Sequence, residues 1–496
     1  MSVYSRQHAG RSGAFCCRLL GATLLASVYA ATPASAGTAT QKGAQKLEDT
    51  LARYFGRTLF DKGMISISPQ GESYDLSFEL DSAKLGVASD SSQIQFGPYS
   101  VLITPKDDGT YGIASTTPSL VLSNKTRMGD QPFEVVERMD GCSQQAVFDP
   151  RLMFFSSQTA SCDSFTMTVR SPVEDIDASS GKVTAQSTGT PGRDGGVDIV
   201  GDADIVDFSE TVTIKNPAQP MVPVVVRADH VHQEATAKGV ATAGILDIAA
   251  FLVGKGSYDK ILAAQDDVKA KVAAAFPIWR ELTGTISSQN LSIGLPVGII
   301  RVAIADQTAT CTGLVKDGRY AVGIKLSGLS MPDGLVPGWA GPLVPKDVDI
   351  NLKLSGIDIE AMAHRVIKSF DAGRNPPLPD SLRMTLLGML GGDRARLDFD
   401  QSLTGTDYDV KGQGGTTLVP NQLGKAQISA SGLDEVINAL NPARGQSMQR
   451  ALLGLSFLKG LARNGPDGRS LWDVEFDSAL KKVVVNGQAF GPGAKQ

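Results

Sequence analysis

The stretch from Val348 to Phe370 constrains the fold most, because it contains a strand pattern and a helix pattern separated by a single Ser-Gly step. Apolar and polar side chains alternate over residues 348–354, which is the period of a strand with one dry face and one wet face. After Ser355-Gly356 the apolar residues recur at helical spacing, and Asp358 is placed to cap the new helix. The stretch therefore predicts a half-buried strand that leads directly into an amphipathic helix.

The same order of strand, Ser-Gly step and apolar residue recurs at residues 320–329 and 426–433. A solenoid needs a fixed repeat length, and these units are unevenly spaced, so they indicate strand ends on one long sheet. Short strand patterns separated by turn residues also fill residues 64–215, which favours antiparallel pairing. We expect an elongated α+β protein dominated by antiparallel sheet, in two sheet-rich halves with helices packed on one side.

A change of pattern in the middle of the chain predicts the domain organisation. Residues 239–253 and 257–282 have the apolar spacing of helices, and Pro277 is expected to kink the second one. A chain of 496 residues is also too long for one compact core. The expected parts are a signal peptide over 1–36, an N-terminal sheet-rich half over 37–235, a helical connector over 236–282 and a C-terminal α+β half over 283–496.

The first 36 residues have the composition of an export signal. Three arginines and no acidic residue precede an apolar stretch over residues 19–31, and the small-residue site Ala34-Ser35-Ala36 follows. Cleavage is therefore expected between Ala36 and Gly37, because the apolar stretch is too short to span about 30 Å of hydrocarbon. We expect an exported protein of the periplasm with no stable membrane span after cleavage.

The net charge limits the classes of partner. Loss of the signal would leave 44 basic residues against 52 acidic ones, so the net charge would change from −5 to −8. A chain this acidic is a poor candidate for binding nucleic acid or anionic membrane surfaces. The expected partners are a lipid or another envelope protein.

Two of the cysteines are expected to form a disulfide. Cys142 and Cys162 lie in one region of strands and turns, and an oxidising compartment favours their pairing over two buried thiols. Such a bond would stabilise the fold by roughly 3 kcal/mol in the chain-entropy model. Cys311 lies in a strand-like run and is expected to be a small buried apolar residue.

The sequence contains few signs of catalysis. It holds no Gly-x-Ser-x-Gly elbow, no Walker phosphate loop, no dinucleotide-binding glycine pattern and no Cys-x-x-Cys. Beyond the expected signal only His230, His232 and His364 remain, which leaves little material for histidine-based mechanisms. No cofactor is expected.

Four groups of residues are nevertheless candidates for a site. His230 and His232 lie two apart on a predicted strand and could ligate a metal, or simply face solvent. Glu360 and His364 could form an acid–base pair on a helix or an ordinary surface pair. The remaining candidates are Asp202, Asp204 and Asp207 for calcium, against a solvated strand end, and Trp339 in a possible exposed apolar loop that could touch a membrane or partner, against a place in the core.

Several segments resemble a known family. These are Leu343-Val344-Pro345, the run from Asn351 to Ile357, the run from Ala430 to Asp434, and the closing Val483-Val484-Val485-Asn486-Gly487. They are similar to an uncharacterised exported family of Gram-negative bacteria, a domain of unknown function, over about residues 45–490. That resemblance implies a periplasmic location and no assigned activity. The chain is also similar in style to AsmA-like envelope proteins, whose long curved sheets present an apolar groove to lipid.

The function expected from these observations is non-catalytic. We expect a periplasmic envelope protein that binds an apolar ligand, such as lipid, or a protein partner through a concavity of its sheet. Export, long half-dry strands and the scarcity of catalytic residues favour it. The alternative is a periplasmic hydrolase that uses carboxylates or a metal at His230 and His232.

Overall fold

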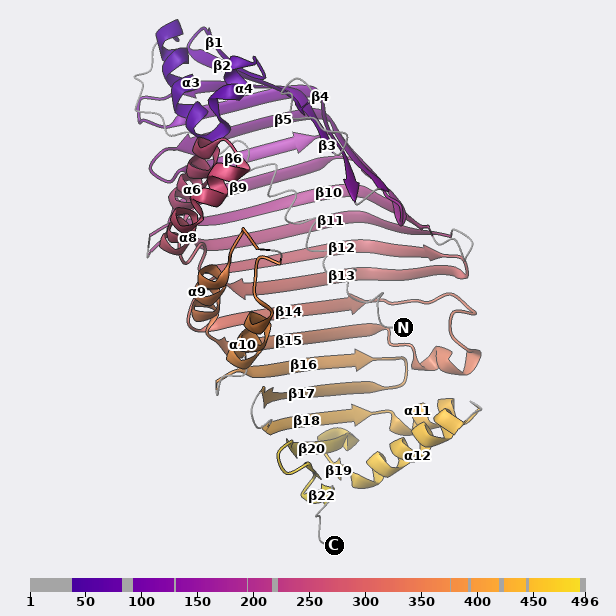
Figure 1. Cartoon of the computed structure of the whole chain (residues 1–496). Coiled ribbons are helices and arrows are strands. Elements are labelled where there is room, and N and C mark those ends of the chain that lie inside the picture. The colour runs from indigo at the N-terminus through magenta and orange to yellow at the C-terminus, as the bar shows by residue number, and fades with distance from the viewer. Residues whose placement is uncertain are drawn as a thin grey trace.

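The protein is dominated by a single antiparallel sheet, seen as a ladder of strands in Figure 1. The computed structural model describes residues 38–82, 92–128, 131–193, 195–215, 222–374, 376–390, 394–418, 423–442 and 446–490. Strands make up 55% of the chain and helices 24%, which confirms the expected sheet-dominated α+β class. The expected signal peptide and its cleavage site at Ala36 and Gly37 lie outside the described residues.

The strands follow one another along the sheet almost in chain order. The first part of the sheet contains β1 (Ile65–Gln70), β2 (Ser73–Asp81), β3 (Ser92–Pro105), β4 (Tyr111–Met128), β5 (Gln131–Asp149), β6 (Phe154–Cys162), β7 (Ser164–Arg170), β8 (Glu174–Ser180), β9 (Val183–Pro191), β10 (Val197–Ile214) and β11 (Pro223–Val240). The second part contains β12 (Glu281–Leu295), β13 (Gly298–Thr312), β14 (Gly318–Ser327), β15 (Asp347–Ile357), β16 (Arg396–Thr404), β17 (Asp409–Thr417), β18 (Leu423–Ser431), β19 (Arg463–Asn464), β20 (Ser470–Asp477), β21 (Lys482–Val485) and β22 (Gln488–Phe490).

Two pairs of short strands act as single bent strands. β6 and β7 pair with opposite halves of β5, while β8 and β9 pair with opposite halves of β10. β6 also pairs with β9, and β7 with β8. With each pair counted as one strand, the sheet is a simple meander from β1 to β18, and β20 continues it beside β18. Such a meander is made of local pairings, which keeps contacting residues close in sequence.

The helices lie at the ends of the strands. They are α3 (Gln41–Phe55), α4 (Arg57–Asp61), α6 (Thr242–Lys255), α7 (Tyr258–Ala263), α8 (Gln265–Ala274), α9 (Ile359–Ser369), α10 (Asp380–Leu390), α11 (Leu433–Leu440) and α12 (Gln446–Leu461), with the short 3₁₀ helices η1 (Gly338–Leu343) and η2 (Pro466–Gly468). Helices α3, α6, α8, α9 and α10 touch in succession and form a row along one end of the strands (Figure 1). Helices α11 and α12 lie at the other strand ends, beside the last strands.

The sheet runs without interruption past the segment expected to separate two halves. Helices α6, α7 and α8 occupy that segment, but β11 and β12 on either side of it pair directly along residues 225–238 and 281–294. The expected division into two sheet-rich halves is therefore not confirmed. The expected kink at Pro277 is wrong, because α8 ends at Ala274, before the proline that cannot donate a backbone hydrogen bond.

One face of the sheet carries most of the apolar side chains, and we call it the apolar face. Cross-strand neighbours share a face, and Val322, Leu352 and Phe399 are successive neighbours on β14, β15 and β16. The neighbours one position away, Lys353 and Asp398, lie on the opposite face, which we call the polar face. The strand period predicted around residue 350 is thus confirmed, and so is the Asp358 cap, which accepts from the Ala361 N–H at 2.8 Å.

The N-terminal end of the apolar face forms the largest core. Ala44, Leu47 and Leu51 recur at helical spacing and place α3 over the first strands. The Thr40 hydroxyl caps this helix by accepting from the Gly43 N–H at 3.1 Å. Below the helix lie fully buried side chains such as Phe148, whose exposed fraction is 0%. This end of the sheet is therefore a packed two-layer structure.

A line of bends crosses the sheet from β5 to the end of β14, and we call it the crease. The residues at these bends are exposed, and those on β10 to β13 lie opposite one another on adjacent strands. The bend residues are Gly141, Asp163, Asp207, Asp229, Asn290, Ala303 and Gly328. Asp207 and Asn290 have φ of +54° and +52°, and the Asn290 side-chain amide donates to Asp229 at 2.8 Å. Left-handed conformations of this kind redirect a strand.

The strands bend toward the apolar face at the crease. Apolar positions are three residues apart across each bend instead of two, as in Ile205 and Phe208, which pack in one cluster with Val231. Ile205, Ala228 and Val302 are only 3–4% exposed beside these bends, whereas the bend residues themselves face solvent. The apolar face is therefore the inner side of the bend, and the two arms of the strands shelter its side chains.

The predicted disulfide lies in the crease. The sulfur atoms of Cys142 and Cys162 are 2.10 Å apart and the Cα atoms 4.0 Å apart, which confirms the expected pairing. Both cysteines follow the register of β5 and β6, next to the bend residues Gly141 and Asp163. Gly141 has φ of +59°, and a Cβ atom there would collide with the Asp163 carboxylate, so this bend requires glycine.

Candidate functional site

The apolar face is uncovered on β14, β15 and β16. We call the large side chains exposed there the open field. Its members are Tyr320, Val322 and Ile324 on β14, Leu352 on β15 and Leu403 on β16, with exposed fractions of 39%, 52%, 46%, 41% and 37%. Partly buried Ile350, Leu354 and Phe399 fill the positions between them. Contiguous exposed apolar surface of this kind marks an interaction site.

The open field exists because the strands there are short. β14 to β18 are 9–11 residues long, whereas β10 to β13 are 15–18 residues long. β14 stops at the crease, where Gly328 follows with φ of +68°. The later strands therefore lack the second arm that covers the apolar face elsewhere. Their inner side chains stay in contact with solvent.

The opposite face over the same strands is charged. Asn351 donates to Asp349 at 2.7 Å, and Arg396 pairs with Asp398 at 2.5 Å. Lys353 lies beside Asp398 in the register. This part of the sheet is a single layer. Its polar face carries charged side chains that suit water, and its apolar face carries side chains that suit an apolar partner.

The apolar face connects the open field to a buried cluster on each side. Toward the N-terminus it continues through the sheltered crease of β10 to β13. Toward the C-terminus it reaches a cluster around Trp472, Ala430 and Val485, which α11 and α12 cover. Trp472 is fixed there because its indole N–H donates to the Leu458 carbonyl at 2.7 Å. The result is one apolar path that crosses most of the strands, at about 4.8 Å per strand.

A carboxyl group lies on the apolar face inside the bent region. Glu210 on β10 has Ala178 and Val226 as its cross-strand neighbours. Burial raises the pKa of Glu210, and the nearby charge of Glu174 raises it further. Desolvation of this kind favours the neutral acid. Glu210 therefore interrupts the apolar path less than an exposed glutamate would.

The two histidines named as metal candidates lie together on the polar face. His230 Nε2 and His232 Nδ1 each lie 2.9 Å from the same Asp204 oxygen, and His232 Nε2 lies 3.3 Å from Glu234. The hydrogen bond to Asp204 raises the pKa of His232, and the same bond lowers the pKa of Asp204. Across the described ranges, no group of three or more His, Cys, Asp or Glu side chains has the arrangement of a metal site.

The serine beside His232 in the register is engaged by another side chain. Ser287 is the cross-strand neighbour of His232, but its hydroxyl donates to Asp306 at 2.6 Å. Asp202 accepts from Gln186 at 3.2 Å, and Asp207 occupies a bend of the crease. The three aspartates considered for calcium therefore lie in different surroundings: Asp202 binds Gln186, Asp204 binds the histidines, and Asp207 lies in a bend. The alternative of a hydrolase at His230 and His232 gains no support from this geometry.

The other sequence candidates lie apart from the open field. His364 on α9 packs against Phe276, with ring centroids 5.1 Å apart. Trp339 lies in η1, is half-buried, and belongs to a segment that contacts α11. Cys311 is half-buried, and burial raises the pKa of its thiol.

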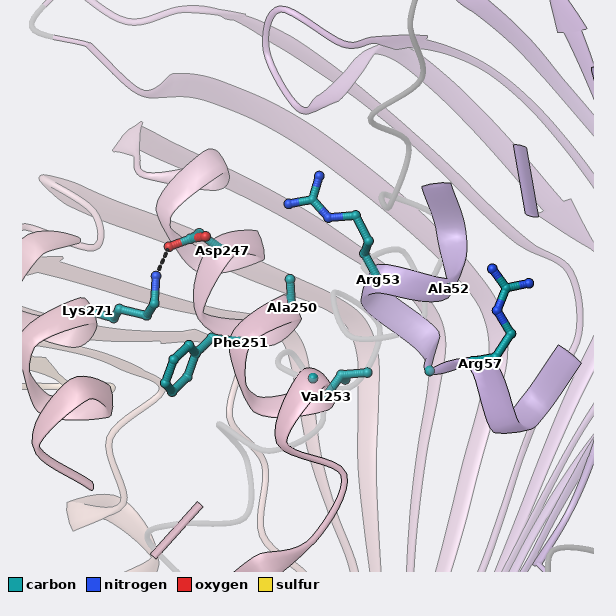
Figure 2. Close-up of a pocket in the computed structure, with 10 residues that line it drawn as sticks. Ala52, Arg53, Arg57, Asp247, Ala250, Phe251, Val253 and Lys271 are labelled. Carbon is teal, nitrogen blue, oxygen red and sulfur yellow. Dashed lines mark hydrogen bonds and ion pairs between the residues drawn. The ribbon is translucent and has the colours of Figure 1, made fainter. Parts of the chain in front are cut away.

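A hollow of about 510 Å³ lies between α3 and α6 (Figure 2). Its charged side chains are largely neutralised: Arg57 pairs with Glu48 at 2.6 Å, and Lys271 pairs with Asp247 at 2.6 Å. Lys271 also lies 5.2 Å from the Phe251 ring centroid. These contacts join α4 to α3 and α8 to α6, so they hold neighbouring helices together around the hollow.

The comparisons with known proteins leave the site to be interpreted from its own geometry. No family model, no characterised protein and no solved structure matches this chain. Within the part of the chain that the structure describes, no helix is long and apolar enough to cross a bilayer.

The sequence pattern predicts apolar strand positions over residues 320–326 and 348–354, but it does not point to Leu403 and does not show whether these side chains are covered. The alternation on β14 and β15 predicts which side chains share a face. Whether that face is covered depends on the length of the neighbouring strands and on the crease. The glycine and aspartate positions of the crease are the only sequence signal that could have indicated where the second arm ends.

Proposed function

We propose that this protein binds lipid acyl chains along its apolar face, in the periplasm of a Gram-negative cell. The observation that carries the proposal is the open field, where five large apolar side chains are 37–52% exposed on one face of a sheet. Covering them would release water from apolar surface, at about 1 kcal/mol for each half-exposed side chain.

The chemistry of the open field suits an acyl chain better than a protein. The backbone groups of β14, β15 and β16 are used in ladders with strands on both sides, so no strand can be added there. The exposed side chains are aliphatic apart from Tyr320. An extended protein segment brings unpaired backbone N–H and C=O groups that need hydrogen bonds, whereas an acyl chain brings none.

The shape of the path also supports a long, thin ligand. The open field extends across β14, β15 and β16, and it ends where the apolar face becomes the buried cluster of β10 to β13. A flexible hydrocarbon can lie across these three strands, at about 4.8 Å per strand. The polar face would meanwhile remain in contact with water.

The test is the lipid content of protein purified from its own cell envelope. We expect native mass spectrometry to show a bound lipid on the wild-type protein. Val322→Gln with Leu352→Gln should remove it, because both changes place an amide on the apolar face.

The matched control is Ala321→Gln with Lys353→Gln. These residues lie one position away on the same two strands but face the other side, and they are also cross-strand neighbours. Lipid should stay bound to this variant. Absence of lipid from the wild type, or equal retention by both variants, would refute the proposal.

A further inference from the structure

Helix α12 exposes large apolar side chains at the C-terminal end of the sheet. Leu453, Phe457 and Leu458 are 71%, 56% and 45% exposed. Leu453 and Phe457 are four residues apart and therefore neighbours on the helix surface. The sequence indicates a helix that is apolar on most sides, which predicts burial. That expectation is wrong, because only one side of α12 is covered.

The covered side of α12 anchors it to the apolar face. Leu461 packs against the cluster of Trp472, and the Leu458 carbonyl accepts the indole hydrogen bond. The Phe457 ring also meets Phe490 on β22, with centroids 5.9 Å apart. The exposed apolar side chains are therefore held in a fixed place, directly beyond the end of the apolar path.

The same end of the molecule carries exposed basic residues. Helix α12 contains Arg450, which is exposed, and Lys459, which pairs with Asp434 of the adjoining helix α11. The turn before β21 adds Leu480, which is 65% exposed, followed by exposed Lys481 and Lys482. Val483 on β21 is the cross-strand neighbour of Phe490, which places this turn and α12 on adjoining elements. We call the exposed residues of α12 and of this turn the C-terminal tip.

We propose that the C-terminal tip docks on the surface of an anionic phospholipid bilayer. Its apolar side chains would enter the interface while Arg450 and the two lysines meet the headgroups. The acidic composition of the whole chain disfavours such a surface, and Asp434 and Asp477 lie beside the tip. The exposed residues Arg450, Lys481 and Lys482 nevertheless give the tip a basic side. The inference rests on the proposed function, for which the tip supplies an entry point from bilayer to apolar face.

The experiment is flotation of the purified protein with vesicles of phosphatidylcholine and phosphatidylglycerol. We expect the protein to bind the mixed vesicles, to bind them less as the salt concentration rises, and to bind vesicles of phosphatidylcholine alone more weakly. Leu453→Gln with Phe457→Gln should weaken binding about tenfold or more, because each change removes a large apolar contact. Arg450→Gln should weaken it about fivefold, as expected for one basic residue at an anionic surface.

The control is Met384→Gln with Leu387→Gln on α10. These residues are 71% and 50% exposed and also lie on a helix, but at the other end of the strands. Vesicle binding should be unchanged in this variant, and circular dichroism checks that all variants fold. Equal loss in both double variants would overturn the proposal, as would a wild type that binds no vesicles but forms a dimer that the Leu453 and Phe457 changes abolish.

Docking and the proposed function fail in different ways. If the wild type carries lipid but does not bind vesicles, only the docking proposal is wrong. If it binds vesicles through the tip but carries no lipid, docking holds and the proposed function is wrong. The Val322 and Leu352 variant should still float with vesicles, because its changes lie outside the tip.

Discussion

The strands that the crease crosses (β5 to β13), which we call the bent region, and the shorter strands β14 to β18, which we call the flat region because they lack the second arm, share one strand pattern. The outcome for their apolar side chains is opposite. In the bent region Ile205 and Val302 are 3% and 4% exposed on the apolar face. In the flat region Val322 and Ile324 occupy the same face and are 52% and 46% exposed. The difference is the second arm beyond the crease, which the flat region lacks. Alternating apolar residues therefore define a face, but only a second layer turns that face into a core.

Under the proposed function, the bent region supplies stability and the flat region supplies the lipid-binding surface. The bent region, together with α3, holds the largest buried cluster, which includes Leu51, Phe148 and Phe155 at 0% exposure. The flat region leaves its apolar surface available to a ligand. The following experiments test whether the two regions divide the work in this way.

The largest expected effect is the loss of a buried aromatic ring in the bent region. Phe148→Ala should lower the free energy of unfolding by about 3–5 kcal/mol, because it leaves a cavity in a packed core. Leu352→Ala in the flat region should cost only about 1 kcal/mol, since its side chain is 41% exposed. Urea unfolding measures both, and similar losses would contradict the division.

The next effect concerns the disulfide of the crease. Replacing Cys142 and Cys162 by alanine should lower the free energy of unfolding by about 3 kcal/mol, because the bond closes a loop with a sequence separation of 20. Reductant should destabilise the wild type similarly and leave this variant unchanged. Cys311→Ala is the control and should respond to reductant as the wild type does. A wild type indifferent to reductant would show that the bond contributes nothing.

The smallest effect comes from the polar face. The hydrogen bond to Asp204 raises the pKa of His232, so the charged pair stabilises the fold below the ordinary histidine pKa of about 6.5. That contribution is lost as pH rises through the raised pKa. It should stay below about 1 kcal/mol because both side chains are about a third exposed.

His232→Gln should therefore flatten the part of the stability profile that declines above about pH 6.5. At low pH the stability depends on Asp204 instead. Because the pKa of Asp204 is lowered, the ionised carboxylate stabilises the fold until the pH falls below the ordinary aspartate range. His364→Gln, which changes a ring packed on Phe276, should keep the decline of the wild type. Equal flattening in both variants would show that the pair has no specific role.

Much of the local structure could be predicted from the sequence because it depends on neighbours along the chain. The alternation around residue 350, the Asp358 cap and the helix of Leu47 and Leu51 are decided by local periodicity and local hydrogen bonds. The disulfide was also predictable, since the two cysteines lie on successive strands. Each of these features involves residues that are close in sequence.

The continuity of the sheet could not be predicted in the same way. The three helices between β11 and β12 look like a boundary in the sequence, yet the strands before and after them pair directly. The burial of α12 was misjudged for a similar reason. Its apolar residues lie on most sides, and only the position of the last strands decides that Leu461 is covered and Leu453 is not.

The amino-acid sequence by itself determined a sheet-rich chain with one apolar and one polar side to its strands, because side-chain direction in a strand follows a period of two. Only the tertiary structure decided where the apolar side is a core and where it is open surface. A side chain is buried only when a second layer of the protein covers the face on which it lies. The crease, the strand lengths and the helix positions place such a layer over the bent region and leave the flat region uncovered.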